Sequence, residues 1–220
     1  EATKIANNGH TSLQKEEPYL LDRLITLIKQ SENIVLTTHR QCDGDGLGAE
    51  LAMYHALIKL GKKARVINID ETPKKYVFLE PGNYIQIFEK DRLLPDQIDL
   101  VLIFDTNDHR LIEPLYSELI KKTKVLAFID HHPILKQGPQ PSKESIIDVT
   151  AASTGEMTYK LIKKLNISLD EKIAKALYTS IAFDTQLFRY IRNSPSSHLI
   201  AAELLQYPIQ PGDVHRYLFS

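Results

Sequence analysis

Short, nearly continuous apolar runs alternate along the chain with segments whose apolar residues recur at helical spacing. The runs are typical of strands buried on both faces, and they cover residues 34–38, 64–69, 100–104 and 125–129. Helical spacing and capping residues predict helices over 19–28, 47–60, 110–122, 153–165, 170–184 and 195–205, and another from 211 onward. This alternation implies crossover connections, so we expect an α/β fold with a mainly parallel sheet flanked by helices.

The beginning of the chain lacks this periodicity. Residues 1–17 are polar, and we interpret them as a disordered tail or a cloning remnant. Residues 18–220 contain no repeat, no low-complexity segment and no obvious interdomain linker before Tyr207. We therefore expect them to form a single domain.

Acidic and histidine residues follow the ends of the apolar segments. Three groups come directly after expected strands, and a further aspartate follows the apolar segment 178–183, which fits either a helix or a strand. In open parallel sheets, ligands collect beyond the carboxyl ends of the strands. We therefore expect a metal site at the carboxyl ends of the strands, formed from His39, Asp43, Asp45, Asp105, Asp130, His131, His132 and Asp184.

Clustered carboxylates and imidazoles suit a pair of divalent cations. Mn2+ and Mg2+ prefer oxygen ligands and Mn2+ also accepts imidazole, whereas the same carboxylates without a metal repel one another. Two ions lower the pKa of a water molecule between them and neutralise phosphoryl oxygens, which favours attack on phosphorus. Each acidic group on its own is more often a cap or turn residue. Four such groups at one edge of a sheet indicate a two-metal hydrolase.

The composition narrows the functional classes. With 27 basic and 28 acidic residues, the net charge is -1, so the chain lacks the basic excess of a module that binds duplex nucleic acid. The single cysteine, Cys42, excludes an intramolecular disulfide and a cysteine-based zinc cluster, and it fits a reducing compartment. No apolar run reaches the roughly 20 residues of a membrane span, and no signal peptide is visible. We expect a cytoplasmic protein that does not associate with membranes.

Motifs occur in a fixed order around these residues. They are His39-Arg-Gln-Cys-Asp-Gly-Asp-Gly-Leu-Gly48, Asp105-Thr-Asn-Asp-His-Arg110, Asp130-His-His-Pro133, Ala152-Ser-Thr-Gly-Glu156 and Tyr178-Thr-Ser-Ile-Ala-Phe-Asp-Thr-Gln-Leu-Phe-Arg189. Over about residues 33–205, this order and spacing resemble the DHH phosphoesterase superfamily. That superfamily contains RecJ-type exonucleases, family II inorganic pyrophosphatases, exopolyphosphatases and nano-RNases. The chain is most similar to RecJ-like or nano-RNase-like N-terminal catalytic domains.

The resemblance implies a role for each residue. One ion would be held by His39, Asp43 and Asp105, and the second by Asp45, Asp105, His131 and Asp184, with Asp105 as the bridging catalytic ligand. His132 would lie beside the substrate phosphate, where it stabilises charge or donates a proton to the leaving oxygen. Arg110 and Arg189 are candidates for phosphate contact, although pairing with a nearby carboxylate explains either arginine at least as well. The implied cofactors are two Mn2+ ions, with Mg2+ as an alternative.

The chain departs from the superfamily pattern at two positions. The superfamily usually has proline where Cys42 stands and glycine where Gln186 stands, and neither position is an expected metal ligand. We interpret Cys42 as a small loop residue rather than a soft ligand or a redox-sensitive thiol. The remaining histidines have no partners at metal-ligand spacing, so we expect surface or packing roles for them. Of these, His109 is close in sequence to the expected site.

Many superfamily members carry a second, C-terminal domain, in which a Gly-Gly-Gly-His-like loop grips the substrate. The nine glycines of this chain never occur in succession. We therefore expect the C-terminal substrate-binding domain to be absent from this chain and to follow in a longer natural protein. The alternative is that a partner or another subunit of a homo-oligomer replaces it.

Three functional hypotheses follow. The leading one is a Mn2+-dependent phosphoesterase that hydrolyses phosphodiester or phosphomonoester bonds of short oligonucleotides, linear or cyclic dinucleotides, or nucleoside bisphosphates. An inorganic pyrophosphatase or exopolyphosphatase would use the same metals, although Thr106-Asn107-Asp108 with Arg110 favours the nuclease side. A metal-binding regulatory module without turnover is the third hypothesis.

Overall fold

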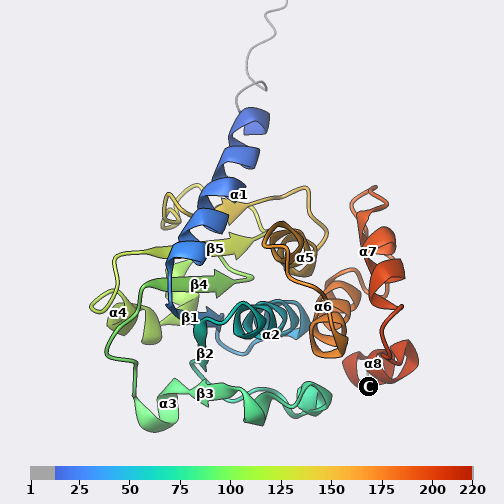
Figure 1. Ribbon diagram of the computed structural model, residues 1–220, viewed down its shortest axis with the longest axis horizontal. Coiled ribbons are helices and arrows are strands. Elements are labelled where there is room, and N and C mark those ends of the chain that lie inside the picture. Colours follow the sequence, from blue (N-terminus) through green and yellow to red (C-terminus); the bar gives the residue numbers. More distant parts are fainter. Residues whose placement is uncertain (1–12, 220) are drawn as a thin grey trace, which may run out of the picture.

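The computed structural model describes residues 13–219 of the chain and shows one sheet with helices on both faces (Figure 1). The strands are β1 (Asn33–Thr38), β2 (Lys63–Asn68), β3 (Ile85–Ile87), β4 (Leu100–Phe104), β5 (Leu126–Asp130) and β6 (Ile146–Ile147). The α-helices are α1 (Leu13–Gln30), α2 (Gly44–Lys59), α3 (Phe88–Asp91), α4 (Leu115–Leu119), α5 (Thr154–Lys164), α6 (Glu171–Asp184), α7 (Ser196–Leu204) and α8 (Pro211–Leu218). Short 3-10 helices are η1 (Lys74–Leu79), η2 (Pro81–Asn83) and η3 (His109–Ile112).

The six strands lie in the order β3-β2-β1-β4-β5-β6, and every neighbouring pair is parallel. This confirms the expected α/β class with a parallel sheet. The chain runs outward in one direction from β1 to β3 and in the other from β4 to β6, so the order reverses between β1 and β4. Ligand sites in such sheets form beyond the carboxyl ends of the strands at this reversal.

Side chains of the central strands alternate between two apolar cores. Leu36 of β1 and Leu102 of β4 are fully buried beneath the face covered by α1, α2, α5 and α6. Their neighbours Val35 and Ile103 point to the opposite face, where α3, η3 and α4 cover the sheet. Burial on both faces explains why these strands are almost wholly apolar in sequence.

Glycines let α2 lie close to the sheet and to α6. A side chain at Gly46 would clash with the Thr38 hydroxyl at the end of β1. At Gly48 it would clash with the Ala176 carbonyl and with Ser180 of α6. The first turn of α2 is thereby brought against the carboxyl ends of the strands and the last turns of α6, where the expected metal site lies.

The structure corrects one expected helix. Residues 110–122 form η3 and the short helix α4 rather than one continuous helix. Proline lacks an N–H group and disfavours the helical conformation in the residue before it. Glu113, which precedes Pro114, is accordingly extended, with φ −75° and ψ 146°. Pro114 therefore separates the two helical segments.

Other differences concern element ends and short strands. α1 begins at Leu13 rather than near Tyr19, so part of the expected tail is helical, and residues 1–12 lie outside the described residues. The edge strands β3 and β6 were not expected, because two or three residues are too short to show a periodicity. Within residues 13–219, no helix combines the length and the apolar character needed to cross a bilayer.

Candidate metal centre

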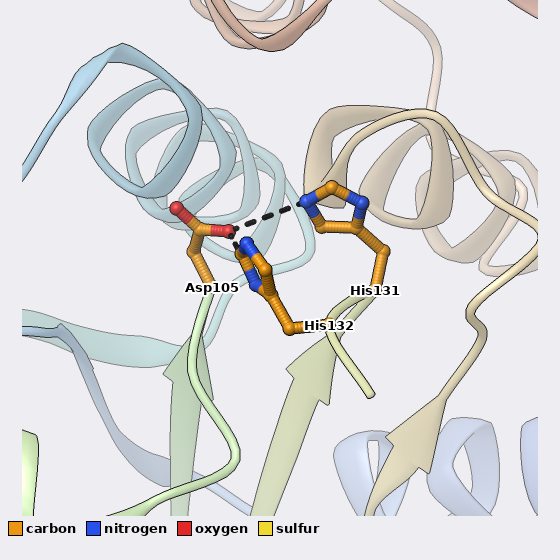
Figure 2. A group of neighbouring side chains, drawn as sticks. All are labelled: Asp105, His131 and His132. Carbon is orange, nitrogen blue, oxygen red and sulfur yellow. Dashed lines mark ion pairs between the residues drawn. The ribbon is translucent and has the colours of Figure 1, made fainter. Parts of the chain in front are cut away.

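The expected site residues gather at the carboxyl ends of β1, β4 and β5 and at the last residue of α6. Potential ligand atoms form three groups, within each of which they lie no more than 4.8 Å apart. The groups are His39 with Asp43 and Asp105, Asp45 with His131 and Asp184, and Asp105 with His131 and His132. Figure 2 shows the third group, with Asp105 following β4 and both histidines following β5. The other five ligands that the resemblance implies are thus brought together around Asp105, whereas Asp130, which was also expected at the site, belongs to none of the three groups found among the described residues.

Asp105 stands between the other ligands. Its Oδ2 atom lies 3.6 Å from Nε2 of His39, and its Oδ1 atom lies 3.7 Å from Nε2 of His131 and 3.7 Å from Nδ1 of His132. Burial raises the pKa of this carboxyl well above its usual range, and the nearby carboxylates of Asp45 and Asp43 raise it further. The two oxygens of Asp105 therefore face the two halves of the cluster.

The backbone at Asp105 is in the left-handed region, with φ +61°. Aspartate tolerates this conformation better than most residues, but it is still less favourable than an extended one. Two hydrogen bonds hold it: the Asp105 N–H donates to the Ile129 carbonyl at 3.0 Å, and the Thr154 hydroxyl donates to Asp105 Oδ1 at 3.0 Å. The turn directs the carboxylate across the ends of the strands.

Asp45 belongs to the first turn of α2, and its fully buried side chain lies against the N-terminus of α5. The N–H of Thr154 donates to its Oδ2 at 2.9 Å, the N–H of Gly155 donates to its Oδ1 at 3.1 Å, and the Ser180 hydroxyl also donates to Oδ1. Burial alone would raise the pKa of Asp45, but the His131 imidazole and these donors outweigh burial and lower it. Helix N-termini favour negative charge, so Asp45 remains a carboxylate although its side chain is fully buried.

The His131 ring provides a test of whether a cation fits the cluster. Its Nδ1 atom lies 3.3 Å from the Ala151 carbonyl, which leaves Nε2 directed at Asp45 Oδ2 and Asp184 Oδ2, each 3.3 Å away. Nε2 is buried and has no hydrogen-bond partner among the described residues. Burial alone would lower the pKa of His131, but Asp45 and Asp184 outweigh burial and raise it to about 9. Positive charge is favoured between these groups, and a divalent cation fits this donor set.

The first group lies on the loop between β1 and α2. Asp43 is the N-cap of α2 and accepts hydrogen bonds from the N–H groups of Asp45 at 2.9 Å and Gly46 at 3.2 Å through one oxygen. Its other oxygen, Oδ2, lies 3.9 Å from Nε2 of His39. The loop is fixed by Asp70, which accepts the Gln41 N–H at 3.1 Å. Asp43 therefore caps α2 with one oxygen and faces His39 with the other.

His132 is half-exposed at the edge of the site and is held from behind by Asp130. Its Nδ1 atom lies 2.8 Å from Oδ1 of Asp130, whose side chain is fully buried. The Asn107 amide donates to Asp130 Oδ2 at 2.7 Å and to the His132 carbonyl at 3.0 Å. The hydrogen bond to Asp130 raises the pKa of His132. Asp130 and Asn107 therefore fix the orientation of an imidazole at the open side of the cluster.

The two expected substrate arginines lie differently. Arg110 forms a two-pronged ion pair with Asp108, from Nε to Oδ1 at 2.9 Å and from Nη2 to Oδ2 at 2.6 Å. Arg110 thus pairs with a nearby carboxylate, which is the alternative to phosphate contact. Arg189 lies over the ring of its neighbour Tyr190, at 5.4 Å from the ring centroid, and among the described residues it has no ion pair with a site carboxylate. Neither guanidinium joins the cluster.

Cys42 is buried at 5 % exposure, and burial raises the pKa of its thiol. A buried protonated thiol is a poor ligand and a poor nucleophile, which agrees with its interpretation as a small loop residue.

The other described histidines have packing roles. His109 stacks on Tyr116, and His55 packs edge-on against Tyr84. His215 hydrogen-bonds Tyr178, and His198 stacks on Phe188. His10 lies outside the described residues.

Sequence patterns missed the residues that hold the ligands. Ser153 caps α5 as expected, through a hydrogen bond from the Glu156 N–H. The following Thr154 and Gly155, however, also bind Asp45, which is 109 and 110 positions away. The signal in the sequence is the motif Ala152-Ser-Thr-Gly-Glu156, which contributes to the family resemblance but does not indicate contacts with Asp45.

Comparison with known proteins agrees with this geometry. The chain is 28% identical over 185 residues to the bifunctional oligoribonuclease and PAP phosphatase NrnA of Thermus thermophilus, covering 80% of this chain and 51% of that protein. The structure of an exopolyphosphatase-related protein from Bacteroides fragilis superposes with a TM-score of 0.81 at 23% identity, covering 92% of this chain and 60% of that one. The exonuclease RecJ bound to manganese superposes with a TM-score of 0.51 at 16% identity, covering 89% of this chain and 54% of that one. The chain spans about half the length of this curated relative.

A family model described as the DHH family, N-terminal domain, matches residues 33–181. The matched region contains all six strands and every cluster residue except Asp184, which lies three positions beyond its end. The chain therefore belongs to the DHH family.

Proposed function

We propose that the protein is a phosphoesterase that uses two divalent metal ions. The observation that carries this proposal is the position of Asp105, whose two oxygens face His39 on one side and His131 on the other. A carboxylate shared in this way is the usual bridge in two-metal hydrolases, whose ions lie about 3.5–4 Å apart. The buried Nε2 atom of His131, which has no hydrogen-bond partner among the described residues, supports the same conclusion.

The proposed ligands divide into two sets. His39, Asp43 and Asp105 would hold one ion, and Asp45, Asp105, His131 and Asp184 would hold the other. When bound, the ions supply Lewis acidity that lowers the pKa of a water molecule and neutralises phosphoryl oxygens. Mn2+ is the proposed metal because the set mixes carboxylates with imidazoles, and Mg2+ is the alternative.

The residues around the ligands have separate tasks. Thr154 and Ser180 fix the carboxylates of Asp105 and Asp45, so that their lone pairs face the centre. His132, held by Asp130, is proposed to lie beside the substrate phosphate and to stabilise its charge or give a proton to the leaving oxygen. Because Arg110 is paired with Asp108, its proposed phosphate contact would require that ion pair to open.

The proposed substrates are short oligonucleotides, linear or cyclic dinucleotides, or nucleoside bisphosphates. Support comes from the relative named as an oligoribonuclease and PAP phosphatase. Inorganic pyrophosphate and polyphosphate are the alternative, supported by the exopolyphosphatase-related structure. A second domain or a further subunit that contacts the substrate stays a prediction, as does a cytoplasmic location.

The test is Mn2+-dependent hydrolysis of short RNA, bis(p-nitrophenyl) phosphate and pyrophosphate by the wild type and by Asp105→Ala. We expect hydrolysis of the phosphodiesters by the wild type and a loss of at least about a thousandfold in Asp105→Ala. Asp96→Asn, which alters an exposed carboxylate that belongs to none of the candidate ligand groups, is the control and should keep full activity. Undiminished activity in Asp105→Ala would contradict the proposal, and pyrophosphate as the sole substrate would favour the alternative.

A further inference from the structure

A pocket adjoins the cluster on the side of β4 and β5. It has a volume of about 440 Å3, within the range typical of small-molecule sites. His39, Asp105 and His132 form the part that borders the cluster, and Leu111, Pro133 and Leu135 line the outer part. Thr106, Asn107 and Asp108 also line the pocket, so its lining combines polar residues with an apolar group of three.

Two leucines that line this pocket, Leu111 and Leu135, have exposed side chains. Leu111 is 53 % exposed and Leu135 is 59 % exposed, although both border a pocket beside charged residues. Each is held by its backbone: the Leu111 carbonyl accepts the Arg40 N–H at 2.9 Å, and the Leu135 carbonyl accepts the Gly138 N–H at 3.0 Å. Exposed apolar side chains that line a pocket mark a surface that a ligand covers.

The charge of the pocket indicates the kind of ligand. Among the described residues, no lysine or arginine lines it, whereas four aspartates do: Asp43, Asp105, Asp108 and Asp130. Arg110 lies close by, at 3.8 Å from the point where a side chain at Gly138 would begin, but its charge is neutralised by Asp108. A chain of further phosphates extending from the cluster would need cations along this wall. A flat, largely apolar group needs none.

We propose that Leu111, Pro133 and Leu135 form a subsite for the nucleoside attached to the reacting phosphate, so that the enzyme selects nucleotide esters over inorganic polyphosphates. This proposal rests on the proposed phosphoesterase function and specifies its substrate class. A base or sugar packed between the two leucines covers apolar surface that is otherwise in contact with water. The phosphate then lies at the polar end, beside His132 and Asp105.

The test compares two diesters that share a leaving group and a charge. Thymidine 5′-p-nitrophenyl phosphate carries a nucleoside, and methyl p-nitrophenyl phosphate carries a methyl group in its place. In Leu111→Ser and Leu135→Ser, we expect kcat/KM for the thymidine ester to fall about tenfold, equivalent to about 1.4 kcal/mol, mainly through KM. The methyl ester should change less than about twofold.

Leu199→Ser is the matched control, since Leu199 is 66 % exposed on α7 and lies outside the pocket. Equal losses for both esters in the pocket variants, or no loss for either, would overturn the subsite. Thermal unfolding should show that all three variants remain folded.

A different result is expected if the protein is not a phosphoesterase. If the wild type hydrolyses neither ester with Mn2+, the phosphoesterase proposal fails. The subsite is then tested by calorimetry with thymidine 5′-monophosphate and with methyl phosphate in the presence of Mn2+. Weaker binding of only the nucleotide to Leu111→Ser and Leu135→Ser supports the subsite, and unchanged or absent nucleotide binding overturns it.

Discussion

The Nδ1 atom of His132 lies 2.8 Å from Oδ1 of the buried Asp130, so the exposed imidazole is anchored to a carboxylate that does not join the candidate metal cluster. Asp130 also accepts the His131 N–H at 2.9 Å through the same oxygen. One buried side chain therefore sets the positions of two consecutive histidines, one facing the ligands and the other facing the pocket.

Asp130→Asn should lower kcat by about 10–100-fold while the fold is kept, because outer partners of a metal site commonly have effects of this size. The amide keeps the shape of the side chain but loses the charge that orients His132. Steady-state kinetics would measure the effect. Combining Asp130→Asn with His132→Gln should add little to the loss caused by His132→Gln alone. Fully additive losses would show that Asp130 does not act through His132.

Thr154→Val should weaken Mn2+ binding by about tenfold or more, because the Asp105 carboxylate loses the hydroxyl that fixes its Oδ1 atom. Thr154→Ser keeps the hydroxyl and should bind nearly as the wild type does. Thr158→Val, which removes a buried hydroxyl one turn further along α5, is the matched control. Titration calorimetry with Mn2+ measures all three. Equal losses in the two valine variants would attribute the effect to helix stability.

Removal of divalent metal should lower the melting temperature, since an ion that binds only the folded state stabilises it by mass action. At a Mn2+ concentration about 100 times the dissociation constant, the expected stabilisation is about 2.7 kcal/mol, or about 5–10 °C for a domain of this size. Differential scanning calorimetry with and without a chelator measures the shift.

Asp105→Asn should change the stability of the metal-free protein and of the Mn2+-bound protein in different directions. Without metal, burial and the carboxylates of Asp45 and Asp43 disfavour the ionised form of Asp105, so the amide should raise the melting temperature. With Mn2+, the variant should lose most of the metal-induced shift. A variant that melts below the metal-free wild type and still responds fully to Mn2+ would contradict this account.

The buried side chain of Glu50 should cause the free energy of unfolding to fall as pH rises. It is fully buried on α2, accepts one hydrogen bond from Asn68 at 2.6 Å, and has a second oxygen without a partner among the described residues. Burial raises its pKa from 4.5 to about 8. Below pH 4.5 both the folded and the unfolded state hold the proton. Between that pH and pH 8 only the folded state does, so the free energy of unfolding decreases over this interval.

Glu50→Gln removes this titration. The variant should match the wild type at low pH and exceed its free energy of unfolding by about 2–4 kcal/mol near pH 8. Urea denaturation at pH 5 and pH 8 measures the difference. The same difference at both pH values would show that Glu50 is not protonated in the folded protein.

The sheet and the proximity of the candidate ligands could be predicted because each group of candidate ligands follows a strand or helix with a strong local pattern. The apolar runs before His39 and Asp105 are long enough to identify strands, and parallel strands end at one edge. The residues that orient the ligands could not be predicted. Thr154 and Ser180 meet Asp45 only after α5 and α6 have packed against α2, and no local pattern records such distant hydrogen bonds.

The periodicity of apolar residues also could not predict which residues have a left-handed backbone conformation. Gln186 has φ +48°, and the next two residues, Leu187 and Phe188, have φ +58° and +67°. The resemblance marks position 186 as one where the family usually has glycine, but neither it nor the periodicity predicts three consecutive residues with positive φ. The Thr185 hydroxyl, which accepts the Phe188 N–H at 2.9 Å, helps to hold the turn that follows Asp184.

The left-handed turn at Asp105 affects the entropy of metal capture. A carboxylate on a flexible loop would lose rotational freedom when an ion binds, and that loss would reduce affinity. At Asp105 the hydrogen bond from Thr154 already restrains the carboxylate in the folded protein, on a backbone with φ +61°. If Asp105 binds an ion as proposed, part of the ordering that binding requires would already have been completed by the fold.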